Sequence, residues 1–571
     1  SKSGSRELSR WVSRPLRDRA EIDKRSSAIE TLREMNNNTF AVAILEKIEE
    51  TLKKSPDVER VIARTHHLNA TPAEFVSAMQ FFITFGKVCE EMRCALQQES
   101  FRKTSVFLDE LLSACADEAT IQTCEKALQA LDLDRANSKA GNLGCSRDAY
   151  VGLFVSDNDD NLKAFPEVFL AQKNLESSKT TMDALLPSLA AQIPGMIKGA
   201  KLSYTSVGGA SGAEFLIEIN DKLKPPNDWI KVSANKSKKV IRYHPPDVLE
   251  NMKSLEANNE RLALACESAW KKFLSEFSRV SYGECRQAAK ATAKIDALNS
   301  LAILSMNDGY CRPEFFDDDD DNAPARIEIV NGRHPTLDAK MVDKFVPNST
   351  SLNIRTRAMI LTGPNMGGKS CFARQVALVA ILAHIGSFVP AQSCRLSVLD
   401  GIYTRAGAAD NLALGQSTFF QEMSETSAIL KSCTKKSLVI LDELGRGTST
   451  SDGYAIASAT LRLLVTKVQC PLVFVTHFSN LAKTFFDEHS NEVFCCFPSF
   501  MKQNDDANDD EKKITFLYSL TEGVAHRSFG LNVASMAGLP TKVIDVAEQK
   551  SLAFETRDLK RMLKNALMKK M

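Results

Sequence analysis

The chain has 571 residues, well beyond the size at which one hydrophobic core stops growing, so we expect several domains. Lysine plus arginine number 72 against 71 aspartate plus glutamate, which excludes a global basic field and leaves only local patches for nucleic-acid contact. The 14 cysteines form no C-x-x-C pair or zinc-type cluster, and no apolar run could span a membrane, so we expect a soluble, intracellular protein without disulfides.

Helical spacing dominates residues 1–196, where apolar residues recur every three or four positions and glycine and proline are scarce. The period changes over residues 197–245, because EFLIEIN and DWIKV alternate like strands and VGGASG and KPPND are typical of turns. Helical spacing then resumes over residues 246–316. We therefore expect a small β module inserted at the far end of two long antiparallel helices.

The inserted module carries a local surplus of positive charge, with seven basic and two acidic residues over 221–242. Exposed lysines of this kind give phosphate contacts without base information, and such contacts weaken with salt. A solvated, charged hairpin is the alternative interpretation. The candidate contacts are Lys231, Lys236, Lys238, Lys239 and Arg242.

A run of five aspartates at 317–321 indicates a solvated linker more than a cation site, and we place a domain boundary there. Beyond it, the apolar segments ARIEIV, RAMILTG, SLVILDE and PLVFVTH are each followed by a helix-like stretch. This alternation predicts a doubly wound parallel sheet over residues 323–538, with a disordered loop at 502–513.

The sequence GPNMGGKS at 363–370 has the G-x-x-x-x-G-K-S pattern of a phosphate-binding loop. It follows a predicted strand and opens a predicted helix, which is the context that separates this motif from a chance match. In such a loop the backbone N–H groups face phosphate oxygens, Lys369 supplies a positive charge, and Ser370 offers a hydroxyl to Mg²⁺.

A second apolar strand, within 437–453, ends in two adjacent carboxylates, Asp442 and Glu443. Because strand residues alternate between faces, Asp442 is expected at the Mg²⁺ shell and Glu443 where an attacking water would lie. A third strand ends before His477, at the sheet edge where ligands of open α/β sheets collect. The pattern predicts nucleotide hydrolysis as well as binding.

The blocks TGPNMGGKS, DELGRGTSTSDG and VTH, in this order, resemble the ABC-type ATPase domain of the MutS family of DNA mismatch-repair proteins. GRHP, FVPN, TRAGAAD and GQSTFFQEM also resemble blocks of that family, and LSRWVSRPLRD resembles the start of its core and lever region. The resemblance thus covers nearly the whole chain. DWIKV, GYCRP and RSFGLNVASMAGLP look most like the eukaryotic branch that recognises insertion/deletion loops.

The resemblance implies that ATP and Mg²⁺ are bound, with Phe345 stacking on adenine and Ser370 and Asp442 at the metal. It implies catalytic roles for Glu443, which would activate water, and for Lys369 and His477. It also implies that Ser417 completes the nucleotide site of a partner subunit, so that a dimer is needed. The remaining loop residues expected at the phosphates are Gly363, Pro364, Asn365, Met366, Gly367 and Gly368.

The family's organisation gives the expected fold: an all-α core and lever with an inserted β clamp, an α/β P-loop ATPase domain, and C-terminal dimerisation helices. The family's mismatch-reading and connector domains have no counterpart here, so we expect either a fragment of a longer protein or a branch without mismatch reading. The expected domains are the first core and lever part at 1–196, the clamp at 197–245, the returning lever at 246–316, the ATPase domain at 323–538 and the dimerisation segment at 539–571.

The function implied is that of a nuclear mismatch-repair subunit, a DNA-dependent ATPase that clamps mismatched or looped-out DNA. Its implied partners are a second MutS homologue and a MutL-type protein. The alternative is a clamp of the meiotic MutS branch, which binds recombination junctions without reading mismatches. A chromosome-organising ATPase is a weaker interpretation, because the lever helices lack sustained heptads.

Overall fold

The protein is a multi-domain α/β chain whose contacts divide it into two compact units. The helical unit comprises Ser1–Arg6, Phe40–Gln98 and Asp109–Asp296, and the sheet unit comprises Glu7–Thr39, Glu99–Leu108 and Ala297–Met571. The domain boundaries expected from the sequence stay a prediction. The computed structural model describes residues 1–38, 41–97, 104–138, 147–155, 163–196, 201–206, 214–317, 323–341, 345–364, 366–406, 418–502, 514–525, 530–553 and 556.

Helix α5 (Pro72–Leu96) organises the core of the helical unit. It begins with a capping box, in which Thr71 and Glu74 satisfy each other's backbone N–H groups, and with proline at its first position. Its buried Phe75 meets Trp270 edge-on, with ring centroids 5.6 Å apart. The shorter helices of this region are α3 (Ala41–Lys53), α4 (Val58–His66), α6 (Val106–Cys115), α7 (Glu118–Gln129), α8 (Leu133–Asn137) and a 3₁₀ turn at Arg147–Tyr150.

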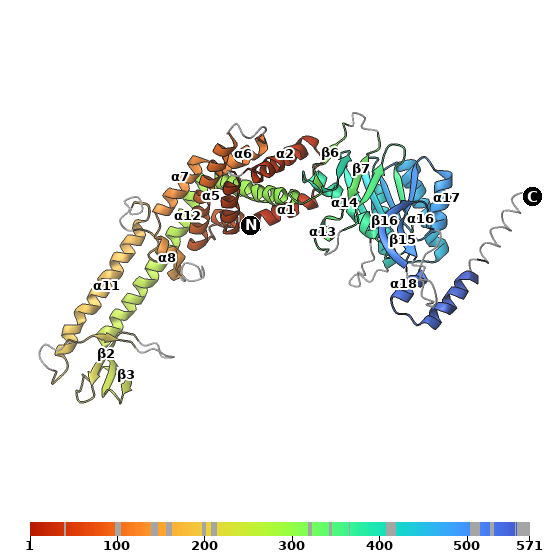
Figure 1. The fold of residues 1–571 in the computed structure, drawn as a ribbon. Helices are drawn as coiled ribbons and strands as arrows, with labels where there is room; N and C mark the ends of the chain where they lie inside the picture. Colours follow the sequence, from red (N-terminus) through yellow and green to blue (C-terminus); the bar gives the residue numbers. More distant parts are fainter. Residues whose placement is uncertain are drawn as a thin grey trace, which may run out of the picture. The chain divides into compact units, whose positions relative to one another are not determined.

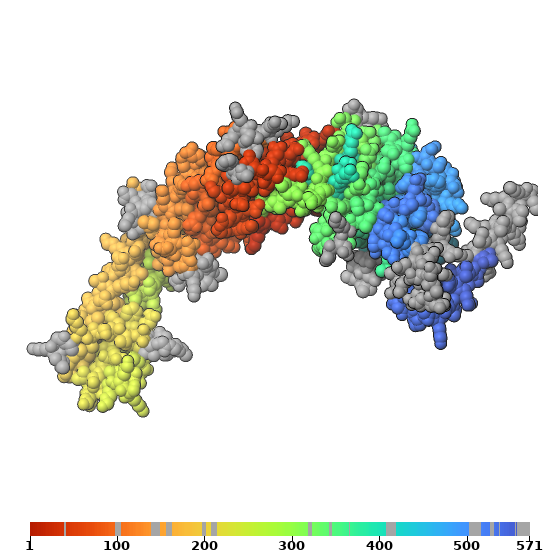
Figure 2. Space-filling model, viewed as in Figure 1, coloured from red at the N-terminus to blue at the C-terminus, as the bar shows by residue number. Residues whose placement is uncertain are grey.

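Two long helices, α11 (Pro166–Ala191) and α12 (Pro246–Ser305), run antiparallel (Figure 1), and α12 belongs to the helical unit as far as Asp296. A four-stranded antiparallel sheet, here called the tip sheet, closes their end in the order β1-β2-β4-β3 and forms a small lobe there (Figure 2). The buried Trp229 and Ile217 pack against apolar side chains of both helices, which gives the tip sheet a core of its own. Its strands are β1 (Tyr204–Thr205), β2 (Leu216–Asn220), β3 (Ile230–Asn235) and β4 (Val240–His244).

A six-stranded sheet forms the centre of the sheet unit, in the order β12-β13-β14-β9-β15-β16. Five neighbouring strands are parallel and β16 is antiparallel. The central strands are buried on both faces, as expected when helices cover both sides of a parallel sheet. The strands are β9 (Ala358–Leu361), β12 (Gly401–Arg405), β13 (Ser437–Asp442), β14 (Leu472–Val475), β15 (Val493–Lys502) and β16 (Ile514–Glu522).

Alternate residues of the six-stranded sheet enter two separate cores. On β14, Val473 joins the core beneath helix α14 (Lys369–His384), whereas Phe474 joins the core beneath α16 (Thr450–Leu463) and α17 (Ser479–Glu488). The other helical segments of this unit are α2 (Arg19–Asn36), α13 (Pro335–Asp338), α15 (Thr418–Ser432), a π-helical turn at Leu464–Val468 and α18 (Gly530–Met536). Helix α1 (Lys2–Ser13) crosses from one unit to the other.

A second, smaller sheet lies beside the central one in the order β6-β11-β7-β8. Residues 541–553 are helical and largely exposed. No helix among the residues described is both long and apolar enough to cross a membrane. The small-sheet strands are β6 (Glu314–Phe315), β7 (Ile327–Gly332), β8 (Asn348–Leu352) and β11 (Ser393–Leu396), and β5 (Tyr310–Cys311) pairs with β10 (Val389–Pro390).

Candidate functional site

The glycine-rich loop joins the end of β9 to the start of α14, and its glycines are required by its geometry. Gly363 has φ +118° and Gly368, the N-cap of α14, has φ +86°, backbone conformations that favour glycine. A Cβ at Gly367 would come within 2.9 Å of Pro498 on β15. The backbone therefore forms a tight turn ahead of a helix N-terminus, an arrangement suited to anions.

Lys369 is the first residue of α14 and is only 3% exposed. Its ammonium group donates hydrogen bonds to the carbonyl oxygens of Gly363, at 2.5 Å, and Pro364, at 2.9 Å. Burial lowers the pKa of Lys369 to about 8, although nearby carboxylates oppose the shift. The loop thus encloses a buried ammonium group whose hydrogen-bond partners are backbone carbonyl oxygens.

Asp442 is the last residue of β13, and it faces this loop. Burial raises its carboxyl pKa, although the nearby Ser370 hydroxyl acts in the opposite direction. Its Oδ1 is buried and has no hydrogen-bond partner among the residues described. An unpartnered, buried carboxylate oxygen is costly, and together with a neighbouring hydroxyl it fits a hard, oxygen-preferring cation.

Glu443 follows directly in a left-handed conformation, with φ +57°, and its N–H donates to the Val475 carbonyl oxygen at 2.9 Å. This turn takes its side chain away from Asp442 and toward the end of β14. Its Oε1 lies 2.5 Å from His477 Nε2, and its Oε2 lies 2.5 Å from Arg446 Nη1. The hydrogen bond to His477 is the main reason that the pKa of Glu443 is lowered despite partial burial.

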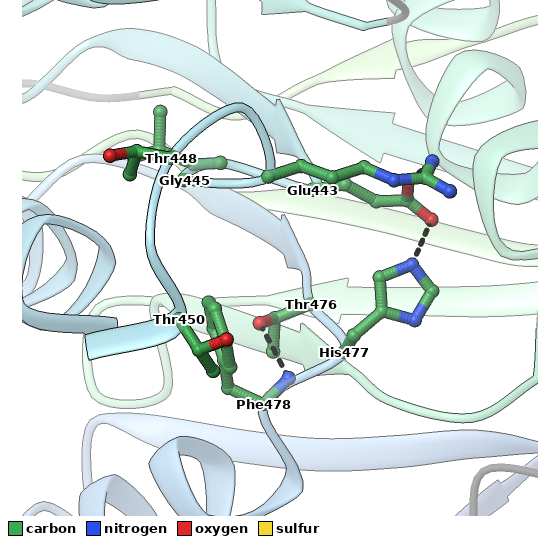
Figure 3. A pocket seen from close by; sticks show the side chains of 9 residues that line it. Glu443, Gly445, Thr448, Thr450, Thr476, His477 and Phe478 are labelled. Carbon is green, nitrogen blue, oxygen red and sulfur yellow. Dashed lines mark hydrogen bonds and ion pairs between the residues drawn. The ribbon is translucent and has the colours of Figure 1, made fainter. Parts of the chain in front are cut away.

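Figure 3 shows the imidazole of His477 pointing at the carboxylate of Glu443. A cavity of about 170 Å³ adjoins this pair and is large enough for ordered water. It is bordered on the remaining sides by Leu444, Gly445, Arg446, Thr448, Thr450, Thr476 and Phe478. The arrangement places a carboxylate, held by two cationic or polar groups, beside a space for a small nucleophile.

Strand pairing explains why residues distant in sequence meet here. Asp442 pairs with Val475, and Val475 pairs with Leu361, so β9, β13 and β14 end at the same level. Of the predicted loop residues, Gly363, Pro364 and Gly367 are buried, whereas Met366 is 60% exposed. Phe345 is partly buried shortly before β8. Asn365 and Ser417 lie outside the described residues.

Two residues at the site were missed by sequence reasoning. Arg446 forms an ion pair with Glu443, and its spacing three residues after the glutamate is the only signal that pointed to it. Pro498 lies against Gly363 and Gly367, but β15 is distant in sequence and carries no phosphate-site motif. The Arg446 contact is local to the loop, whereas the Pro498 contact is set by tertiary packing.

The tip sheet presents lysines around the turn between β3 and β4. Lys236, Lys238 and Lys239 are exposed at this turn, and Asn235 shapes it by accepting a hydrogen bond from the N–H of Lys238. Lys231 is also exposed, but it lies near the start of β3, away from the turn. The fifth predicted cation differs from these. Arg242 is mostly buried and pairs with Glu218 at 2.9 Å, so part of its charge is neutralised within the sheet.

Comparison with known proteins places both parts of the chain in one family. Residues 1–302 match MutS domain III, and residues 359–555 match MutS domain V. The chain belongs to the MutS family. The resemblance inferred from the sequence blocks is therefore confirmed.

Curated relatives cover almost the whole of this MutS-family chain. It is 36% identical over 571 residues to the DNA mismatch repair protein MSH3 of Arabidopsis thaliana, covering 95% of this chain and 50% of the relative. It is 37% identical over 580 residues to the msh3 protein of Botryotinia fuckeliana, covering 97% and 47%. The chain spans about half the length of the curated relatives it matches.

The two matches to MutS domains divide the candidate residues between them. The glycine-rich loop, the acid pair and His477 lie within the domain V match, and the tip sheet lies within the domain III match. Phe345 lies between the two matches.

Proposed function

We propose that this MutS-family chain is a subunit of a DNA mismatch-repair heterodimer that binds and hydrolyses ATP and uses the nucleotide state to control its grip on DNA. One observation supports this most: Lys369, Ser370, Asp442 and Glu443 come together where three parallel strands end. The curated relatives are named DNA mismatch repair proteins, which favours this function over the recombination-junction clamp.

The glycine-rich loop is proposed to act as a P-loop for ATP with Mg²⁺. Backbone N–H groups at the start of α14 and the ammonium group of Lys369 would contact the phosphates, and Phe345 would stack on adenine. Ser370 and the free Oδ1 of Asp442 would hold the metal. The described residues hold no cluster of three His, Cys, Asp or Glu side chains, as suits a cation shared with phosphates.

Glu443 is proposed as the general base for water. Its lowered pKa keeps it ionised at neutral pH, and the neighbouring cavity has room for the nucleophile. His477 orients the carboxylate through Oε1. Magnesium, when bound, supplies positive charge that stabilises the phosphates during transfer.

A dimer is part of this proposal. Ser417 is assigned, through the family resemblance, to the partner subunit's nucleotide site. The exposed Val543 and Val546 lie three residues apart in the helical segment 541–553, on one face, which suits a helix that packs on another subunit. A second MutS homologue and a MutL-type protein are the proposed partners, and the nucleus is the proposed location.

The tip sheet is proposed as a DNA clamp at the end of lever helices. Its exposed lysines would contact the phosphates of mismatched or looped-out duplex DNA without reading bases. Nucleotide binding at the sheet unit would then act on DNA through rigid helices.

The test uses the full-length protein with and without its partner subunit. We expect ATP turnover by the heterodimer to rise when duplex DNA with an extrahelical loop is added, compared with perfectly paired duplex of equal length. The isolated subunit should bind ATP and turn it over poorly. Full turnover by a strictly monomeric subunit would overturn the composite site, and equal stimulation by both duplexes would overturn the proposed substrate.

A further inference from the structure

The loop that follows Glu443 is held from two sides by backbone packing. Gly445 has φ +90°, and a Cβ there would lie 2.5 Å from the carbonyl oxygen of Gly453, in the first turn of α16. A Cβ at Gly447 would lie 3.1 Å from Cβ of Phe419, in the first turn of α15. The loop is therefore wedged between the beginnings of α15 and α16.

One side chain of α15 bonds directly to this loop. Glu422 is 5% exposed, and its Oε1 accepts a hydrogen bond from the N–H of Gly445 at 2.7 Å. The bond lies in the interior, where a charged acceptor strengthens it. Gly445 is only two residues from Glu443, so the bond fixes the backbone that carries the carboxylate.

The other oxygen of Glu422 faces a buried arginine at the end of β12. Arg405 is 6% exposed, and its Nη2 lies 3.9 Å from Oε2 of Glu422. The same arginine approaches Glu425 at 3.0 Å, one turn further along α15. Arg405 thus compensates the buried charge of Glu422, which leaves Oε1 directed at the loop.

We propose that Glu422 is a positioning residue that couples α15 to Glu443. This rests on the proposed function, which assigns the segment immediately before α15, including Ser417, to the partner subunit's nucleotide site. When the partner displaces the start of α15, Glu422 transmits the movement to Gly445 and so to the hydrolytic carboxylate. Hydrolysis at one site thereby responds to occupancy of the other.

Two variants of equal size isolate the hydrogen bond. Glu422→Gln and Glu422→Met both remove the charge facing Arg405, but only glutamine retains an acceptor for the Gly445 N–H. In the full-length heterodimer we expect Glu422→Met to lower kcat about tenfold or more, while the Kd for ATP changes less than about twofold. Glu422→Gln should stay within about threefold of wild-type kcat.

Glu425→Gln is the matched control, because Glu425 pairs with the same arginine from the same helix. It should leave kcat within about twofold of wild type. Equal kcat values for the Gln and Met variants would overturn the proposal. So would a Met variant with wild-type turnover.

Hydrogen exchange on the nucleotide-free wild-type protein needs no variant. The amide of Gly445 should exchange at least about tenfold more slowly than an unstructured amide, and its rate should change together with the amides of α15 when partner subunit is added. Exchange at the unstructured rate would overturn the proposal even if both variants failed to fold. If the wild-type heterodimer did not hydrolyse ATP, the proposed function and the coupling would fail, while this amide would still report on the hydrogen bond.

Discussion

Two regions of the molecule carry charged side chains with opposite exposure. The charges are buried at the candidate nucleotide site, at the edge of the central sheet, and exposed on the tip sheet. At the sheet edge, Lys369 is 3% exposed and Asp442 is 9% exposed. Burial lowers the pKa of the lysine and raises the pKa of the aspartate, and both shifts favour the neutral form. On the tip sheet, Lys236, Lys238 and Lys239 are exposed around a short turn. Buried charges at fixed positions suit chemistry on one small ligand, whereas exposed charges suit loose contact with a long polyanion.

Glu443→Ala tests the sheet-edge half of this comparison and should have the largest effect. The variant should bind ATP normally in the heterodimer, while kcat falls by about 10²–10⁴-fold, because only the general base is lost. Single-turnover hydrolysis and equilibrium ATP binding measure the two effects separately. The control is Glu488→Ala on α17, which removes an exposed ion-pair partner of Arg462 on α16. Unchanged steady-state hydrolysis in Glu443→Ala would remove the assignment.

Trp229→Ala tests whether the stability of the tip sheet is independent of ATP binding in the sheet unit. Trp229 is 5% exposed in the core between the sheet and the long helices, so its loss should destabilise the tip sheet by about 3–5 kcal/mol. Hydrogen exchange over residues 214–245 should accelerate, while ATP affinity stays the same. The neighbouring Ile230, which is 56% exposed, supplies the control Ile230→Ala. Loss of ATP binding in Trp229→Ala would contradict this independence.

A triple variant that replaces Lys236, Lys238 and Lys239 with glutamine tests whether the exposed charges of the tip sheet contact DNA. Duplex affinity should fall, and the slope of log K against log salt should decrease by up to about 3, since each phosphate contact contributes about 0.9. A salt titration of DNA binding gives the slope. The double variant Lys53→Gln, Lys54→Gln removes two exposed charges at the C-terminal end of α3 and should leave the slope unchanged. An unaltered slope in the triple variant would refute the clamp.

The pH dependence of ATP binding should show the smallest effect. The pKa of Lys369 is about 8 in the folded protein against an ordinary 10.5, so the unfolded chain binds more protons between these values, and Lys369 makes the unfolding free energy rise with pH there. ATP requires the charged form, so its Kd should increase up to about tenfold from pH 7 to pH 9. Lys369→Arg stays charged, and its Kd should vary less over this range. A flat wild-type profile would contradict the buried, titrating ammonium.

Much of the fold could be read from local pattern. The apolar runs before Gly363, Asp442 and His477 predicted buried parallel strands, and these became β9, β13 and β14. The order of strands within the sheet could not be read, because it depends on which faces pack together and not on sequence position. The packing of Ile22, from α2, into the core of the sheet unit was equally hidden, since its helical spacing fits several partners.

The site was predictable in its parts and less so in its connections. The acid pair was found because it ends an apolar strand in the same domain as a phosphate-binding loop, but alternation alone did not predict the left-handed Glu443. The pairing of Arg446 and His477 with the two oxygens of that carboxylate depends on the turn it makes. The Glu422–Gly445 bond joins segments 23 residues apart, and no short motif records such a contact.

Strand β14 lies between the strand that leads into the glycine-rich loop and the strand that bears the acid pair. Its buried Phe474 fills the core below α16 and α17. Replacing Phe474 with a smaller residue would leave a cavity beside both flanking strands, so it should lower the amount of folded protein and disturb the spacing of the loop and the acid pair. Variants in this strand should therefore be judged by protein abundance and by ATP turnover together, because one interior replacement acts on both.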